Sequence, residues 1–210
     1  MNKYLALQKD VLDINKVTVI GSPTITSDGV ASGFSKDNYI TKTFTSLFNN
    51  NYNFEIDSKI NYQVSETNPN QVLWYFFWIF QCRIGSGKLH FLMPYGSNYV
   101  RSQAVLADYG INTGDDLYVK CISENASSRK LMFSKDGVNW NTITNTATTD
   151  KDLSTYTTCR LGQDPDGAIL HGSIDLKQFK IYVDGQLVFQ PVKPTYLLER
   201  RNENYYMLRR

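Results

Sequence analysis

The sequence contains little cysteine, and none of it at metal-binding spacing. Its cysteines are an odd number and lie far apart, at Cys82, Cys121 and Cys159. A disulfide scaffold needs an even set at close spacing, and a zinc site needs paired Cys or His ligands. We therefore expect free thiols in a reducing compartment and no structural metal.

Long apolar runs and charge of one sign are also missing. The most apolar segment, residues 72–80 (VLWYFFWIF), has nine residues, whereas a membrane-spanning helix needs about 20. The N-terminus has no apolar segment long enough for a secretory signal. The net charge is +2 and the basic residues are scattered, which leaves no electrostatic footprint for nucleic acid. The sequence predicts no membrane partner, no nucleic-acid partner and no export by the general secretory route.

What the sequence does have is a series of glycine turns between alternating apolar stretches. The turns are Asp28-Gly29, Gly85-Ser86-Gly87, Asp136-Gly137 and Asp184-Gly185. Asp-Gly is a strong hairpin signal, because tight primed turns need positive φ angles. Residues 53–64 alternate between apolar and polar side chains, and residues 72–80 are typical of one or two buried strands. With no helical periodicity, the chain predicts a single all-β domain of two packed antiparallel sheets.

We divide the chain into an N-terminal arm (1–16), a core domain (17–190) and a C-terminal tail (191–210). The arm is apolar without a turn that closes it into a hairpin, and the tail carries five cations against two acids. A cationic, aromatic tail on a near-neutral body suits a docking segment, although packing of both ends against the domain explains the same residues. We expect assembly to use Tyr4, Leu7, Tyr196, Arg200, Arg201, Tyr205 and Tyr206.

Three segments of the core domain carry a family resemblance. They are residues 23–40 (PTITSDGVASGFSKDNYI), 131–143 (LMFSKDGVNWNTI) and 160–189 (RLGQDPDGAILHGSIDLKQFKIYVDGQLVF). In their order and spacing, the chain resembles concanavalin A-like, laminin-G-like jelly-roll modules over residues 17–190, and particularly those of tailed-bacteriophage virion proteins. The resemblance implies a two-sheet antiparallel jelly-roll sandwich of the lectin and glucanase type. Such modules bind carbohydrate or receptors, or serve in virion assembly.

Some relatives with this fold cleave β-glucans through a strand that reads Glu-x-Asp-x-Glu. Here residues 55–59 read Glu-Ile-Asp-Ser-Lys, so Lys59 stands where the acid/base carboxyl would be. A retaining mechanism needs two carboxyl groups about 5 Å apart, and an ammonium with a pKa of about 10.4 is a poor general acid. We expect no enzymatic activity and interpret Glu55, Asp57 and Lys59 as a solvated strand face.

Other motifs are interpreted as structural. Residues 134–140 resemble a sialidase Asp-box that is one residue short, and predict a hairpin with Trp140 packed over it. Asp164-Pro165-Asp166-Gly167 could offer oxygen atoms to calcium, but six or more ligands are not found nearby, and a turn is the simpler interpretation. His90 and His171 have no partner at triad or zinc spacing. We predict no cofactor and no metal.

The residues best suited to contact a sugar lie in a predicted loop, residues 93–101 (MPYGSNYVR): Tyr95, Asn98, Tyr99 and Arg101. Aromatic faces stack on sugar rings, while Asn and Arg hydrogen-bond to hydroxyl groups. The same types also occur in ordinary loops.

Together these features favour a non-enzymatic structural component of a bacteriophage virion: a fibre, tail or capsid decoration subunit, with adhesion to a glycan or receptor. The expected partners are other virion proteins, further copies of the chain in a homo-oligomer and a host surface glycan. The expected localisation is the virion, after synthesis in the host bacterial cytoplasm. The alternative is a carbohydrate-binding module of a bacterial surface or secreted system.

Overall fold

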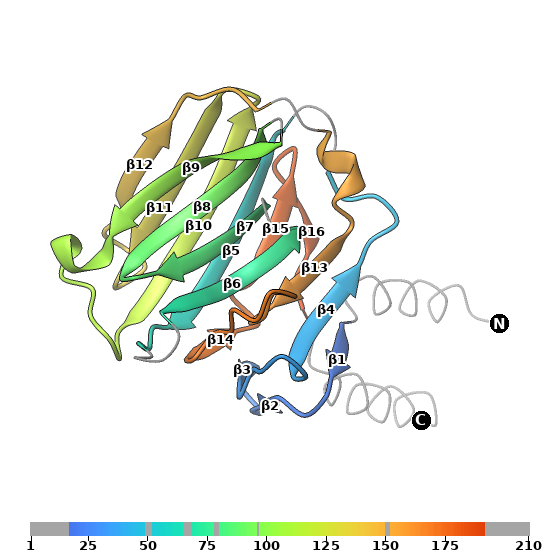
Figure 1. Ribbon diagram of the computed structural model, residues 1–210, viewed down its shortest axis with the longest axis vertical. Coiled ribbons are helices and arrows are strands. Elements are labelled where there is room, and N and C mark those ends of the chain that lie inside the picture. The colour runs from blue at the N-terminus through green and yellow to red at the C-terminus, as the bar shows by residue number, and fades with distance from the viewer. Residues whose placement is uncertain are drawn as a thin grey trace, which may run out of the picture.

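The computed structural model describes residues 17–48, 52–64, 69–77, 80–95, 97–149 and 152–191. Within these ranges every strand pair is antiparallel, and the strands form two sheets that pack face to face (Figure 1). Helix is limited there to the 3-10 turns η1 (Leu106–Tyr109) and η2 (Leu153–Thr155). None of the helices in the described ranges has the length and apolar character needed to cross a bilayer. The predicted antiparallel sandwich is confirmed.

One sheet has seven strands, in the order β1 (Thr18–Ile20), β4 (Tyr39–Thr43), β13 (Thr158–Leu161), β6 (Asn70–Phe77), β7 (Phe80–Gly85), β8 (Lys88–Tyr95) and β9 (Asn98–Val105). The other has nine, in the order β12 (Asn141–Asn145), β11 (Ser128–Ser134), β10 (Asp116–Asn125), β5 (Phe54–Asn61), β14 (Ser173–Asp175), β3 (Val30–Ser32) and β2 (Thr24–Ile25). Its remaining strands are β15 (Lys180–Val183), which pairs with β5, and β16 (Gln186–Phe189), which pairs with β15.

All four predicted glycine turns connect paired strands, but they are of two kinds. Ser86-Gly87 and Asp184-Gly185 have positive φ angles at both residues (50° and 74°, 51° and 75°), as two-residue type I′ turns require. The other two turns are held by side-chain oxygen atoms. Thr26 Oγ1 accepts a hydrogen bond from Val30 N at 3.1 Å, and Asp136 Oδ1 accepts from Val138 N and Asn139 N at 2.8 Å each.

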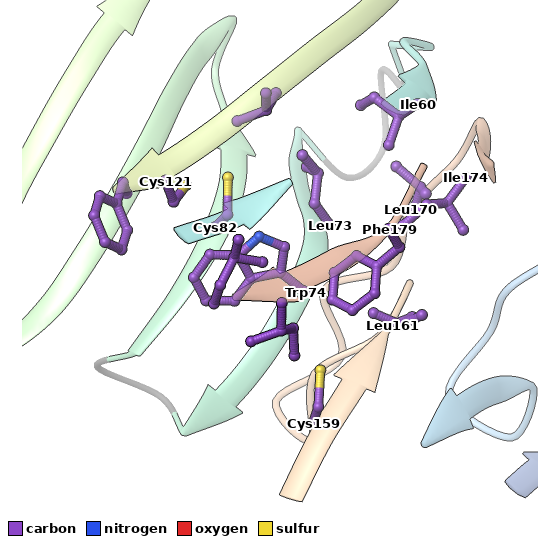
Figure 2. Packing of buried hydrophobic residues seen from close by; sticks show 14 of the residues in the cluster. Ile60, Leu73, Trp74, Cys82, Cys121, Cys159, Leu161, Leu170, Ile174 and Phe179 are labelled. Carbon is purple, nitrogen blue, oxygen red and sulfur yellow. The ribbon is translucent and has the colours of Figure 1, made fainter. Parts of the chain in front are cut away.

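Strand alternation decides which side chains enter the core. In β5, Phe54, Ile56, Ser58 and Ile60 are buried between the sheets, and the intervening residues face outward, as predicted. The apolar run at residues 72–80 contributes to two neighbouring strands, β6 and β7. Trp74 lies at the centre of the core (Figure 2). Its ring makes edge contacts with the rings of Phe76, Phe80 and Phe91. Loss of a buried aromatic side chain of this kind costs about 3–5 kcal/mol.

The three cysteine thiols lie in this core. Cys82, Cys121 and Cys159 are free and buried (Figure 2), as predicted. Burial, and then the neighbouring Cys82, raises the pKa of the Cys121 thiol. Buried free thiols of this kind act as small apolar packing groups.

The predicted arm and all but the first residue of the predicted tail lie outside the described residues. The same holds for every residue that we expect to mediate assembly: Tyr4, Leu7, Tyr196, Arg200, Arg201, Tyr205 and Tyr206. Their role stays a prediction.

Candidate functional site

The outer face of the seven-stranded sheet presents a row of side chains that crosses all seven strands. Strand register places side by side Thr18, Thr41, Arg160, Tyr75, Gln81, Leu92 and Arg101. A second row, displaced by two residues along β7, β8 and β9, contains Val72, Arg83, His90 and Gln103. The opposite side chains of the same strands, among them Trp74, Cys82 and Phe91, enter the core. We call these two rows the outer face.

Arginine and tyrosine side chains lie together on this face. The Arg160 guanidinium lies over the ring of Tyr39, 4.8 Å from its centroid, and Arg101 lies over Tyr99 at 5.8 Å. Arg160 Nη1 also donates a hydrogen bond to Gln163 Oε1 at 3.2 Å. Planar cations on aromatic rings hold both groups in place, while their remaining N–H donors stay available.

An open pocket of about 260 Å³ lies at the β6–β7 side of the outer face. It is lined by Asn70, Gln81, Arg83, Asp164, Asp166, Gly167 and Ala168. Its residues are almost all polar. Gln81 is only 3% exposed, although its side chain projects from the outward side of β7. The pocket therefore offers hydrogen-bond donors and acceptors in a recessed position.

The Asp164–Gly167 segment forms one wall of that pocket as a closed turn. Asp164 Oδ1 accepts a hydrogen bond from Ala168 N at 2.9 Å, and Gly167, with φ +95°, donates its N–H to the Asp164 carbonyl at 3.2 Å. The interpretation of this segment as a turn is confirmed. In the described ranges, no cluster of three or more His, Cys, Asp or Glu side chains could hold a metal ion.

The four residues that we expect to contact a sugar divide between two sides of one hairpin. They lie at the ends of β8 and β9 and not in a loop, because the β8–β9 pairing continues to Tyr95 and Asn98. Tyr99 and Arg101 project onto the outer face. Side chains alternate along a strand, so Tyr95 and Asn98 project from the other side, where Tyr95 is 48% exposed.

His90 lies on the outer face between Arg83 of β7 and Gln103 of β9. Burial, together with the charges of Arg83 and Arg101, lowers the pKa of His90 to about 4, so the ring is neutral at pH 7. The sequence indicated no ligand role for it, since it stands alone in the chain. The register brings the polar neighbours to it from other strands.

A second polar cluster lies on the outward side of the nine-stranded sheet. Lys120 of β10 donates to Glu55 Oε1 at 2.6 Å and to Asp57 Oδ2 at 3.2 Å. Burial, and then the hydrogen bond with Glu55 and its charge, raise the pKa of Asp57 to about 7. Burial opposes ionisation of Glu55 too, but the hydrogen bond from Lys120 brings the pKa of Glu55 below its usual value. These residues form a half-buried ion-pair cluster, whereas the sequence suggested a freely solvated face.

Lys59 has a separate partner in this sheet. Its Nζ lies 2.8 Å from Asp116 Oδ2, and that contact raises the pKa of Lys59 above its ordinary value. A more basic ammonium donates its proton less readily.

The neighbouring hairpin also has the predicted geometry: Trp140 folds back so that its Nε1 donates to the Gly137 carbonyl at 3.1 Å.

Most residues of the outer face were not among those predicted from the sequence. Gln81 and Arg83 alternate with core residues of β7, which was a usable signal that they face outward. The sequence could not predict that Arg160 and Tyr75 lie side by side, because β13 and β6 are far apart along the chain.

The sequence matches no known protein-family profile, and no curated protein matches it. Solved structures do match. The receptor-binding domain of botulinum neurotoxin mosaic serotype C/D superposes with a TM-score of 0.58 at 12% identity, over 79% of this chain and 42% of that one. The enzymatically active domain of tailspike protein 2 from bacteriophage CBA120 gives 0.55 at 10% identity, over 85% and 31%.

A third match is the ligand-binding domain of botulinum neurotoxin serotype D in complex with N-acetylneuraminic acid. It has a TM-score of 0.53 and 11% identity, over 86% of this chain and 44% of the other. The present chain thus spans less than half the length of each of these structures. At such low identities the likeness concerns the fold, and it confirms the jelly-roll sandwich.

Proposed function

We propose that this protein is a non-enzymatic structural subunit of a bacteriophage virion, and that its sandwich binds glycan through the outer face of the seven-stranded sheet. The observation that carries the glycan part is the gathering of Tyr39, Tyr75 and Tyr99 with Arg101 and Arg160 on one sheet face, next to an open polar pocket.

Sugars need this combination of groups. Their C–H faces pack on aromatic rings, and their hydroxyl groups take hydrogen bonds from planar donors and from amide or carboxylate acceptors. Gln81, Asn70 and Asp166 at the pocket supply such acceptors. Of the residues that we expect to contact a sugar, Tyr99 and Arg101 belong to this binding face, whereas Tyr95 and Asn98 project from the opposite side of the same hairpin.

The absence of catalysis is argued from the ion pairs of β5. Glu55 is engaged by Lys120, and Lys59, held by Asp116, occupies the position of the missing acid/base carboxyl. The position that holds the proton-donating carboxyl in the Glu-x-Asp-x-Glu strand therefore carries an ammonium in this chain. The tailspike domain with a similar fold is enzymatically active, so this part of the proposal rests on the residues and not on the fold.

The virion context is supported by the resemblance of residues 23–40, 131–143 and 160–189 to phage virion modules. A fold shared with a phage tailspike domain is in keeping with it. In this role the termini attach the subunit to other virion proteins or to further copies, and the outer face contacts a host surface glycan.

A glycan array with the full-length chain tests the binding role. We expect the wild type to bind at least one bacterial surface glycan and the Tyr99→Ala, Arg101→Ala double variant to lose that binding. The matched control is Tyr182→Ala, Lys180→Ala, which removes a tyrosine and a cation from β15 in the other sheet. Equal binding by both double variants would contradict the assignment of the outer face.

Mass spectrometry of purified phage particles tests the virion role. The chain should be present at a fixed copy number per particle. Its absence from intact particles that are made by cells expressing it would contradict that role.

A further inference from the structure

The two sheets differ in whether their cationic side chains lie next to carboxylates. Lysines of β5, β10 and β11, and Lys135 just after β11, form ion pairs with carboxylates in or next to the nine-stranded sheet. On the outer face of the seven-stranded sheet, Arg83, Arg101 and Arg160 have no carboxylate within 4.0 Å in the described part of the chain. An arginine fork matches a carboxylate with two parallel hydrogen bonds, so the donors of this face fit an anionic ligand.

Arg83 shows the mismatch most clearly. Its Nε is buried in the wall of the outer face and has no hydrogen-bond partner. A charged donor that is hidden from water without a partner is costly. A ligand oxygen at that point would satisfy it.

His90 adds a second unsatisfied atom beside Arg83. The side chain is 5% exposed, and its Nδ1 has no partner. The ring donates its proton to the Gly85 backbone, and a neutral imidazole carries only one N–H. Nδ1 is therefore an acceptor, which suits a hydroxyl group and not an anion.

We propose that the outer face binds an acidic sugar, with Arg83 and Arg101 holding its carboxylate and His90 Nδ1 accepting a hydrogen bond from a neighbouring hydroxyl. The two arginines come from strands on either side of the strand that carries His90. They stand two strands apart and two residues out of register, about 12 Å between Cα atoms, and two arginine side chains are long enough to reach one carboxylate from that separation. This inference rests on the proposed glycan-binding function and narrows it to one class of glycan.

The acids of the pocket lie beside Arg83, at one end of this arrangement. Asp164 and Asp166 lie beyond Arg83, on the turn that closes the pocket. There they can accept hydrogen bonds from the hydroxyl groups of the next sugar unit.

Calorimetry with matched ligands tests the proposal on the full chain. The probes are N-acetylneuraminic acid and an oligogalacturonate, each beside its methyl ester, which keeps the sugar and removes the charge. We expect at least one acid to bind and its ester to bind at least tenfold more weakly. The third probe is an oligosaccharide of neutral sugars that carries a sulfate group, which supplies a negative charge without a carboxylate.

Variants identify the residues. Arg83→Gln and Arg101→Gln should each weaken binding of the acid at least tenfold and weaken binding of the ester much less, so that the preference of the wild type for the acid over its ester is lost. Lys130→Gln, which removes a cation paired with Glu124 on the other sheet, is the control and should change neither. Circular dichroism and the melting temperature verify that each variant is folded.

Each outcome bears on the proposal. If acid and ester bind equally, or the sulfated sugar binds as tightly as the acid, recognition of a carboxylate is overturned. The same holds if Arg83→Gln and Arg101→Gln bind the acid like the wild type. If only neutral glycans bind, the acidic class is wrong while the proposed function stands. If the folded protein binds no glycan on the array and none of these probes, both fail.

Discussion

Replacement of Lys120 by methionine should destabilise the sandwich in a pH-dependent manner. The Lys120 ammonium lies 2.6 Å from Glu55 and 3.2 Å from Asp57, and the side chains are 29%, 31% and 18% exposed. Exposed ion pairs contribute about 0–1 kcal/mol, whereas removal of one partner from a buried pair costs about 3–5 kcal/mol. At this intermediate burial we expect a loss of about 2 kcal/mol in the free energy of unfolding at pH 8.

The dependence on pH follows from Asp57. Its pKa is raised to about 7 in the folded state, against about 4 in an unfolded chain. The stability that its protonated form contributes is complete below about pH 4 and is lost as the pH rises through about 7. Without Lys120 the ionised form is less favourable still. The loss at pH 5, where Asp57 keeps its proton, should therefore be about half of the loss at pH 8.

Thermal unfolding at pH 5 and pH 8 measures this effect. For a chain of this length, about 2 kcal/mol corresponds to a fall in melting temperature of roughly 4–8 °C. Lys120→Arg keeps the charge and should be affected much less. Equal losses at the two pH values, or equal damage from Lys120→Arg, would refute the argument.

Three further predictions concern packing and assembly. Gly162→Ala should lower the melting temperature strongly, since Gly162 has φ +78° and an added Cβ would lie 2.4 Å from the Phe34 ring; an unchanged melting temperature would contradict that geometry. The three cysteine thiols should not react with a thiol reagent in the native protein and should react fully in denaturant, because all are buried; rapid native labelling would show otherwise. Deletion of residues 192–210 should leave a folded sandwich that no longer oligomerises or joins the particle, as size-exclusion chromatography and particle composition would reveal; unfolding of the truncated chain, or normal assembly, would rule out the docking role of the tail.

Much of the fold could be predicted from the sequence because its signals are local. The Asp184-Gly185 turn specifies its own φ angles, and the alternation of β5 specifies which of its faces is buried. The order of the strands is not local: β5 pairs with β10, β14 and β15, which follow it at very different distances along the chain. No pattern within β5 indicates those neighbours.

The candidate site shows the same limit. Tyr99 and Arg101 were identified by residue type, but the direction of Tyr95 and Asn98 depends on the register of the β8–β9 hairpin, in which a shift by one residue reverses every side chain. The polar face of β5 was predicted correctly, but its ion pairs were not, because Lys120 reaches Glu55 and Asp57 from β10. Contacts between strands create both polar clusters.

The most direct test of the glycan-binding face is amide chemical-shift mapping of the labelled full-length protein, titrated with the glycan that binds most tightly on the array. We predict that the perturbed signals belong to β6, β7, β8, β9 and β13, with the largest shifts near Arg83, His90 and Arg101. Shifts confined to the nine-stranded sheet, around Glu55 and Lys120, would contradict the central claim.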